Sequence, residues 1–191
     1  MVYYFGKYFF WLFLKLFCRF RVTGLENVPQ NGPLLVIANH VSYWDPIVLG
    51  VAMPRKVYFM AKEDLFHIPV LNWTIRHMGA FPVKRDFNDL KALKTALRHL
   101  QQEEVVGIFP EGTRSKNGKL QPFQKGAFVL ALRTNAAVLP VALINTSKIW
   151  KGFWFKPVEV RIGKPLIPEQ EGGNYKESLA QKSFEALEKL L

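Results

Sequence analysis

Residues 34–46 read LLVIANHVSYWDP and place a histidine and an aspartate directly after a short apolar run. The run from Leu34 to Ala38 is short for a helix and is typical of a buried strand. His40 and Asp45 follow it, and on one continuous helix their spacing would turn them about 140° apart. They can meet if the chain leaves the strand, turns, and starts a helix near Asp45, where Pro46 fits the first turn. The stretch therefore predicts a strand, a tight turn and a helix.

Two interpretations of Asp45 follow from these residues. An imidazole held by a carboxylate can take a proton from a hydroxyl near neutral pH, which makes His40 and Asp45 a candidate catalytic pair. Alternatively, Ser42 and Asp45 have the spacing of a capping box, or Asp45 caps a helix that Pro46 begins. In that case Asp45 is purely structural. The motif alone leaves both interpretations open.

The composition predicts one basic domain. The chain has 191 residues, which is enough to bury a core without disulfides or a metal ion. Its single cysteine, Cys18, excludes an internal disulfide, and no Cys/His cluster has the spacing of a zinc site. The formal net charge of +11 indicates an anionic partner: a nucleic acid, a phospholipid surface or a phosphorylated substrate.

The N-terminal segment, residues 1–21, favours a helix that lies in a membrane interface. It is dense in large aromatic residues, and Lys7 and Lys15 interrupt every apolar run before it reaches the roughly 20 residues of a spanning helix. On a helix, Lys7, Lys15, Arg19 and Arg21 fall within an arc of about 160°, with the aromatic residues elsewhere. A signal peptide is disfavoured because it would carry its positive charge ahead of the apolar run and small residues at a cleavage site, and this segment has neither. A tilted spanning helix and a core helix remain alternatives.

Strand and helix patterns alternate through the remainder, residues 22–191, which we interpret as the catalytic domain. The clearest helix is predicted at 88–104, with a leucine face and Asn88 as its cap. This order predicts an α/β single domain with a mixed, largely parallel central sheet flanked by helices.

A second polar motif, FPEGTR at 109–114, also follows an apolar strand. Ligands of open α/β sheets bind beyond the carboxyl ends of the strands, where both motifs are expected. Gly112 permits close backbone approach, Thr113 offers a hydroxyl, and Arg114 offers a bidentate fork for an anion. The cations that could extend a phosphate site are Lys84, Arg85, Lys116 and Lys125. Alternatively, Glu111 and Arg114 form an ion pair on a turn and the cations are solvated.

Four segments together resemble the sequence blocks of the glycerolipid acyltransferase family, typified by 1-acylglycerol-3-phosphate acyltransferase. They are NHVSYWD (39–45), GAFPVKR (79–85), FPEGTRS (109–115) and VLPVAL (138–143). The resemblance extends from about Val22 to Leu166. The first and third blocks are specific in combination, whereas the second and fourth are weak alone.

This resemblance implies transfer of a fatty acyl group from acyl-CoA or acyl-carrier protein to the hydroxyl of 1-acylglycerol 3-phosphate. His40 would be the general base and Asp45 its support, with no acyl-enzyme and no cofactor or metal. Holding the acceptor's glycerophosphate is implied for Arg85 and for Glu111, Gly112, Thr113 and Arg114; Lys84 and Lys125 are further candidates from the residues themselves. Peripheral attachment to the cytoplasmic face of a membrane is expected from the N-terminal helix and from where acyl thioesters are made.

Other functions remain as alternatives. The same chemistry would serve glycerol 3-phosphate or another lysophospholipid as acceptor. An ester or thioester hydrolase is disfavoured because a G-x-S-x-G nucleophile elbow is missing. A non-catalytic phospholipid-binding module is the other rival. Nucleic acid is a disfavoured partner because the cations are scattered between strands, without the aromatic-laced basic face of a single-strand binder.

Overall fold

The computed structural model describes residues 2–84, 89–149, 156–168 and 174–191. They form a seven-stranded sheet in the order β1-β7-β6-β2-β5-β3-β4. The strands are β1 (Arg21–Thr23), β2 (Leu34–Ala38), β3 (Val57–Lys62), β4 (Ala80–Val83), β5 (Val105–Ile108), β6 (Ala137–Ile144) and β7 (Glu159–Ile162). The strands from β6 to β4 pair in parallel, β7 is antiparallel to β6, and β1 is parallel to β7. The predicted α/β fold with a mixed, largely parallel sheet is confirmed.

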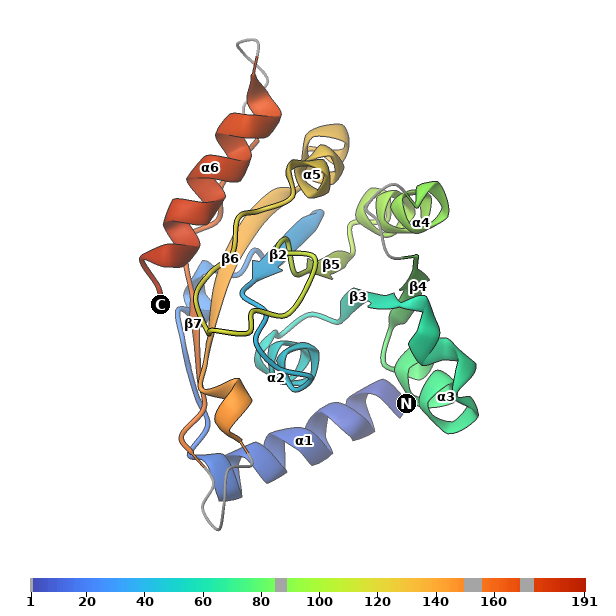
Figure 1. Ribbon diagram of the computed structural model, residues 1–191, viewed down its shortest axis with the longest axis vertical. Helices are drawn as coiled ribbons and strands as arrows, with labels where there is room; N and C mark the ends of the chain where they lie inside the picture. The colour runs from blue at the N-terminus through green and yellow to red at the C-terminus, as the bar shows by residue number, and fades with distance from the viewer. Residues whose placement is uncertain (1, 85–88, 150–155, 169–173) are drawn as a thin grey trace.

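Helices cover both faces of this sheet (Figure 1). They are α1 (Val2–Cys18), α2 (Asp45–Ala52), α3 (Pro69–His77), α4 (Leu90–Gln101), α5 (Val129–Thr134) and α6 (Tyr175–Glu188). Short 3₁₀ turns complete the order: η1 (Leu25–Asn27), η2 (Glu63–His67), η3 (Lys125–Phe128) and η4 (Thr146–Lys148). Because side chains alternate along a strand, each β2 residue contributes to one of two cores.

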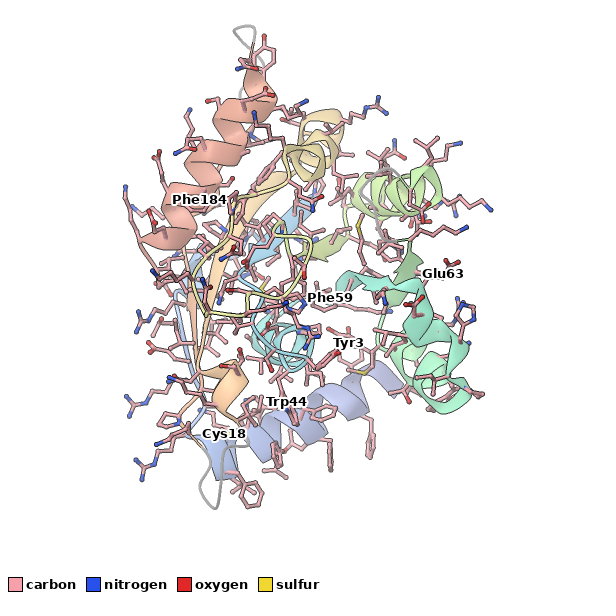
Figure 2. All side chains as sticks on the ribbon, in the orientation of Figure 1. Tyr3, Cys18, Trp44, Phe59, Glu63 and Phe184 are labelled. Atoms are coloured by element: carbon pink, nitrogen blue, oxygen red, sulfur yellow. The ribbon has the colours of Figure 1, made fainter. Side chains whose placement is uncertain are left out.

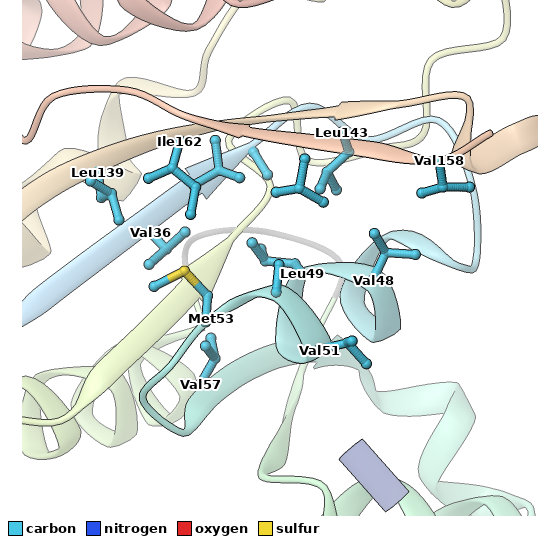
Figure 3. Close-up of a cluster of buried hydrophobic side chains, with 14 of the residues drawn as sticks. Val36, Val48, Leu49, Val51, Met53, Val57, Leu139, Leu143, Val158 and Ile162 are labelled. Atoms are coloured by element: carbon cyan, nitrogen blue, oxygen red, sulfur yellow. The ribbon is translucent and has the colours of Figure 1, made fainter. Parts of the chain in front are cut away.

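The first core lies between the sheet and α2, and α1 packs outside α2. From β2 it takes Leu34, Val36 and Ala38. Figure 3 shows Val36, Leu139 and Ile162 from the sheet facing Leu49 and Met53 from α2 and the turn after it. The second core takes Leu35 and Ile37 and is closed by α4, α5 and α6. Every β2 side chain is thus buried, as the apolar run predicted.

Helix α1 has one face on the protein and one face exposed. Tyr3, Leu14 and Cys18 are buried, and Phe10 and Phe13 pack against Trp44. Figure 2 shows Trp44 between α1 and the rest of the domain. The opposite face exposes large apolar and aromatic side chains: Val2, Tyr4, Phe5, Tyr8, Phe9, Trp11, Leu12, Leu16 and Phe17. None of the described helices is both long and apolar enough to cross a membrane.

The cations of this segment are arranged differently from the predicted arc. Lys7 faces the protein, and its ammonium group donates a hydrogen bond to the carbonyl of Met53, the C-cap residue directly after α2. A cation is favourable there because helix carbonyls concentrate negative charge at the C-terminus. Burial lowers the pKa of Lys7. The helix ends at Cys18, so Arg19 and Arg21 lie beyond it and only Lys15 is an exposed cation within it.

The N-cap of helix α4 lies one residue later than the predicted cap, and the helix begins at Leu90. The side chain of Asp89 accepts hydrogen bonds from the backbone N–H groups of Lys91, at 2.9 Å, and Ala92, at 3.2 Å. Asp89 is therefore the N-cap. The proposed cap, Asn88, lies outside the described residues.

Candidate active site

The two motifs lie next to each other at the carboxyl ends of β2 and β5. The connections that follow these two strands run to opposite sides of the sheet. β2 and β5 are paired in parallel, so their carboxyl ends share one edge of the sheet. The chain leaves β2 through α2, on one face, toward β3, whereas it leaves β5 through α5, on the other face, toward β6. Such a switch point is where open α/β sheets form ligand sites. NHVSYWD follows β2 there and FPEGTR follows β5.

His40 and Asp45 form the predicted pair. His40 Nδ1 lies 2.7 Å from Asp45 Oδ2; the Asp45 side chain is fully buried, and 20% of the His40 side chain is exposed. The same Oδ2 accepts the backbone N–H groups of Val41, at 2.6 Å, and Ser42, at 2.7 Å. The carboxylate therefore holds both the imidazole and the turn that presents it.

The first turn of α2 explains this geometry. The helix begins at Asp45 with Pro46 in its first turn, and the hydroxyl of Ser42 accepts the N–H of Trp44 at 3.2 Å. Of the two bonds of a capping box, the one from the Ser42 N–H to the Asp45 carboxylate forms, whereas the Ser42 hydroxyl accepts from Trp44 and the N–H of Asp45 donates to the Ser42 carbonyl. One carboxylate therefore makes both the contact to the imidazole and the contacts to the turn that the two interpretations of Asp45 predicted.

Glu111 joins the second motif to the first. Its buried carboxylate accepts the backbone N–H of His40 at 2.6 Å with Oε1, and that of Gln121 at 3.0 Å with Oε2. Burial raises the pKa of Glu111, and the two backbone hydrogen bonds oppose that shift. Both oxygens are thus engaged within the protein. Glu111 connects the turn between His40 and Asp45 to the loop after β5, and its oxygens bind backbone N–H groups instead of forming the alternative ion pair with Arg114.

Two further contacts hold the motifs together. The backbone N–H of Ser115 donates to the carbonyl of His40 at 2.7 Å, and the loop after β5 passes over the β2–α2 connection in Figure 1. The imidazole of His40 stacks on the ring of Phe109, with centroids 4.1 Å apart and planes 19° apart. Sequence reasoning missed Phe109 as a site residue, although its place directly after β5 was a signal.

The remaining FPEGTR residues lie on the exposed side of the loop. Gly112 has φ 73°, in the left-handed region that favours glycine, and a β-carbon there would also displace the end of the Gln124 side chain. Thr113 is exposed. Arg114 is exposed as well, and its guanidinium lies over the ring of Tyr43, with Cζ 3.6 Å from the centroid. Tyr43 was also missed, although it lies between His40 and Asp45.

The other predicted cations are more distant or directed elsewhere. Lys84 follows β4, which is two strands from β5 and therefore roughly 10 Å away across the sheet. Lys125 begins η3, and its ammonium group lies 3.7 Å from Glu177 Oε1 on α6. Lys116 is exposed in the loop after Ser115. Arg85 lies outside the described residues. Lys62, which ends β3 next to β5, is a further cation at this edge and contacts Asp64.

Metal ligands are not clustered in the described part of the chain. No group of three or more His, Cys, Asp or Glu side chains there could hold a metal ion. The chemical groups at the switch point are an imidazole paired with a buried carboxylate, a guanidinium, and the backbone of a glycine turn. Together they can accept a proton and bind an anion.

Several known proteins are similar to this chain in sequence. A sequence model of the acyltransferase family matches residues 19–144, which include both motifs. The chain is 38% identical over 136 residues to the chloroplastic 1-acyl-sn-glycerol-3-phosphate acyltransferase LPAT1 of Arabidopsis thaliana, covering 70% of this chain and 38% of that protein. It is 31% identical over 147 residues to the 1-acyl-sn-glycerol-3-phosphate acyltransferase of Bacillus subtilis, covering 76% and 73%.

A solved structure agrees with these sequence matches. The crystal structure of the 1-acyl-sn-glycerophosphate acyltransferase PlsC from Thermotoga maritima superposes with a TM-score of 0.76 at 29% identity, covering 98% of this chain and 76% of that one. Three of the similar sequences are longer proteins, of which the aligned part is 38%, 39% and 52%. The residues matched by the family model, 19–144, make up more than half of the chain and include His40 and Asp45. The chain belongs to the acyltransferase family.

Proposed function

We propose that this protein transfers a fatty acyl group from acyl-CoA, or from acyl-carrier protein, to the free hydroxyl of 1-acylglycerol 3-phosphate, giving phosphatidate. The observation that carries the proposal is the 2.7 Å contact between His40 Nδ1 and the buried Asp45, at the strand edge where FPEGTR supplies Arg114. The similar proteins in plants and bacteria carry the name of this activity.

The reaction needs one base and no covalent enzyme intermediate. Asp45 occupies Nδ1 of His40, which leaves Nε2 to take the proton of the acceptor hydroxyl. The acceptor oxygen then bonds to the thioester carbonyl carbon, and a tetrahedral intermediate forms. When that intermediate collapses, the C–S bond breaks and the thiolate takes the proton back from the imidazolium. The products are the ester and the free thiol, and the histidine is regenerated.

Arg114 is the proposed anchor for the acceptor's phosphate, with Gly112 and Thr113 lining the same turn. A guanidinium offers five N–H donors in a fork that suits a phosphomonoester. Lys84, Arg85 and Lys125 remain proposed contributors to the surrounding positive potential. Glu111 supports this site indirectly, because its two oxygens accept backbone N–H groups.

Membrane attachment through α1 completes the proposal. Its exposed aromatic face suits the interfacial region of a bilayer, and the acceptor is a membrane lipid. We propose peripheral attachment, with the cytoplasmic leaflet as its site.

The test is a product analysis with purified protein and radiolabelled oleoyl-CoA. Lysophosphatidate, glycerol 3-phosphate and lysophosphatidylcholine are offered separately, and the lipids are resolved. Labelled phosphatidate formed only with lysophosphatidate is the expected result. If a different ester formed, the acceptor would be another lysophospholipid or glycerol 3-phosphate. Free fatty acid alone would indicate a hydrolase. No product with either oleoyl-CoA or oleoyl-acyl-carrier protein would contradict the proposal.

A further inference from the structure

An exposed tyrosine in the first motif holds the arginine of the second. The guanidinium carbon of Arg114 lies 3.6 Å from the ring centroid of Tyr43. Arg114 Nη2 donates a hydrogen bond to the Tyr43 hydroxyl at 2.9 Å. The Tyr43 side chain is 68% exposed, so burial in the core does not account for its position. The contact joins residues that are 71 positions apart in the chain.

An aromatic partner leaves the positive charge of Arg114 available. A carboxylate partner would neutralise the guanidinium and compete with an incoming phosphate. The face of a tyrosine attracts the cation through its quadrupole and fixes the plane of the fork. One N–H donates to Tyr43, and the other donors of the guanidinium can still serve a ligand.

The backbone on both sides of this contact is fixed to the catalytic pair. Tyr43 lies in the turn closed by the N–H of Asp45, which donates to the carbonyl of Ser42 at 3.3 Å. On the other side, Ser115 follows Arg114 and donates its N–H to the carbonyl of His40 at 2.7 Å. Tyr43 and Arg114 are therefore both positioned relative to His40, not merely relative to each other.

We propose that Tyr43 is a positioning residue that holds the Arg114 guanidinium in place for the phosphate of the acceptor. This inference rests on the proposed function. Tyr43 itself is not proposed to contact the reacting atoms. It sets the distance and orientation between the anion anchor and the general base.

Two substitutions at Tyr43 separate the contributions of its ring and its hydroxyl. Tyr43→Leu removes both the aromatic face and the hydrogen bond, whereas Tyr43→Phe keeps the face. In the lysophosphatidate assay we expect Tyr43→Leu to raise KM about tenfold with kcat within about twofold of wild type, and Tyr43→Phe to raise KM about threefold or less. Unfolding midpoints of both variants show whether the α2 turn is retained.

A double-mutant cycle with Arg114→Lys tests whether Tyr43 acts through the arginine. Lysine keeps the charge but cannot stack a planar fork on the ring. In the Arg114→Lys background, Tyr43→Leu should change KM by less than about twofold. Equal effects of Tyr43→Leu in both backgrounds, or a KM for Tyr43→Leu close to that of wild type, would overturn the inference.

Calorimetric titration with glycerol 3-phosphate in neutral detergent micelles separates this inference from the proposed function. It measures binding of a phosphomonoester whether or not the protein turns over lysophosphatidate. Binding by wild type and Tyr43→Phe, weakened about tenfold in Tyr43→Leu, supports the inference. Equal binding by Tyr43→Leu, or no binding by wild type, contradicts it even if phosphatidate is formed.

Discussion

Asp45 makes both kinds of contact that the sequence could only offer as alternatives, one to the imidazole of His40 and one to the backbone of the turn. Its Oδ2 atom accepts from the His40 ring and from the N–H groups of Val41 and Ser42, while the buried Oδ1 has no hydrogen-bond partner among the described residues. The spacing of His40 and Asp45 predicted a turn between them. It could not reveal that one oxygen would serve both the turn and the imidazole, because that depends on the geometry of the turn.

Replacing this carboxylate should reduce catalysis. In Asp45→Asn the amide oxygen can still accept a backbone N–H, but the negative charge that supports the imidazolium is lost. We expect kcat for phosphatidate formation to fall by about 100-fold or more.

Ser42→Ala is the matched control for that substitution. It removes the hydroxyl that accepts the N–H of Trp44 and leaves the Asp45 carboxylate in place. The expected result is a loss of about 0.5–2 kcal/mol in the free energy of unfolding, with little change in kcat. If Ser42→Ala lowered kcat as much as Asp45→Asn, the role of Asp45 would be that of a helix cap alone.

Glu111 was predicted as a substrate-binding residue, and its contacts now favour a structural connection between the motifs. Glu111→Gln should destabilise the protein by about 1–3 kcal/mol, because an amide has one acceptor oxygen and the carboxylate accepts two N–H groups. The free energy of unfolding and the KM for lysophosphatidate together check this. A raised KM with unchanged stability would instead indicate direct contact with the acceptor.

Among the helices, α1 best shows what sequence periodicity can predict and what it cannot. The aromatic density of residues 1–21 predicted an interfacial helix, and the described helix does expose one aromatic face. Lys7 was grouped with the other cations because the predicted arc was drawn from the positions on one helix alone, without the elements that pack against it. The end of α2 decides its actual direction, since the Met53 carbonyl attracts the ammonium group. Such a contact between elements has no local sequence signal.

Removing apolar side chains from the exposed face of α1 should weaken membrane binding. Phe5, Phe9 and Leu16 are 75%, 58% and 68% exposed, so their combined replacement by serine should leave the fold intact. We expect vesicle binding to fall at least tenfold, because each side chain contributes transfer free energy on entering the interface. Sedimentation with phosphatidylglycerol-containing vesicles measures it.

The control for that triple variant uses exposed apolar residues outside α1. Leu90 and Ile167 are 69% and 64% exposed, and both are replaced by serine. Unchanged sedimentation of this control variant is expected. Equal losses in both variants, or no loss in the α1 variant, would argue against α1 as the main membrane contact.

The whole molecule brings together two motifs separated by about 70 positions, because β2 and β5 are neighbours. The sequence indicated the polar ends of both strands, since each motif follows an apolar run. It did not give the strand order, which is set by pairing between distant segments. For that reason the sequence could name Lys84 and Lys125 as candidates but could not predict their distance from the site. Lys84 follows the edge strand β4, and Lys125 contacts α6.

The N-terminal helix is also part of the domain's core, which bears on its prediction as a separate membrane segment. Leu14 is fully buried, whereas Leu16 on the same helix is 68% exposed. Leu14→Ala should lower the free energy of unfolding by about 2–5 kcal/mol, and Leu16→Ala by no more than about 0.5 kcal/mol. Denaturant unfolding in identical buffer compares them. Equal, small effects would mean that α1 is detachable from the domain.

We propose His40, held by Asp45, as the base in acyl transfer to lysophosphatidate. The decisive measurement is the rate of phosphatidate formation from oleoyl-CoA and lysophosphatidate with wild type and His40→Ala, after circular dichroism has shown that both are folded. We expect His40→Ala to lower kcat by at least about 100-fold without loss of vesicle binding. Phosphatidate formation at the wild-type rate by folded His40→Ala would show that His40 is not the base.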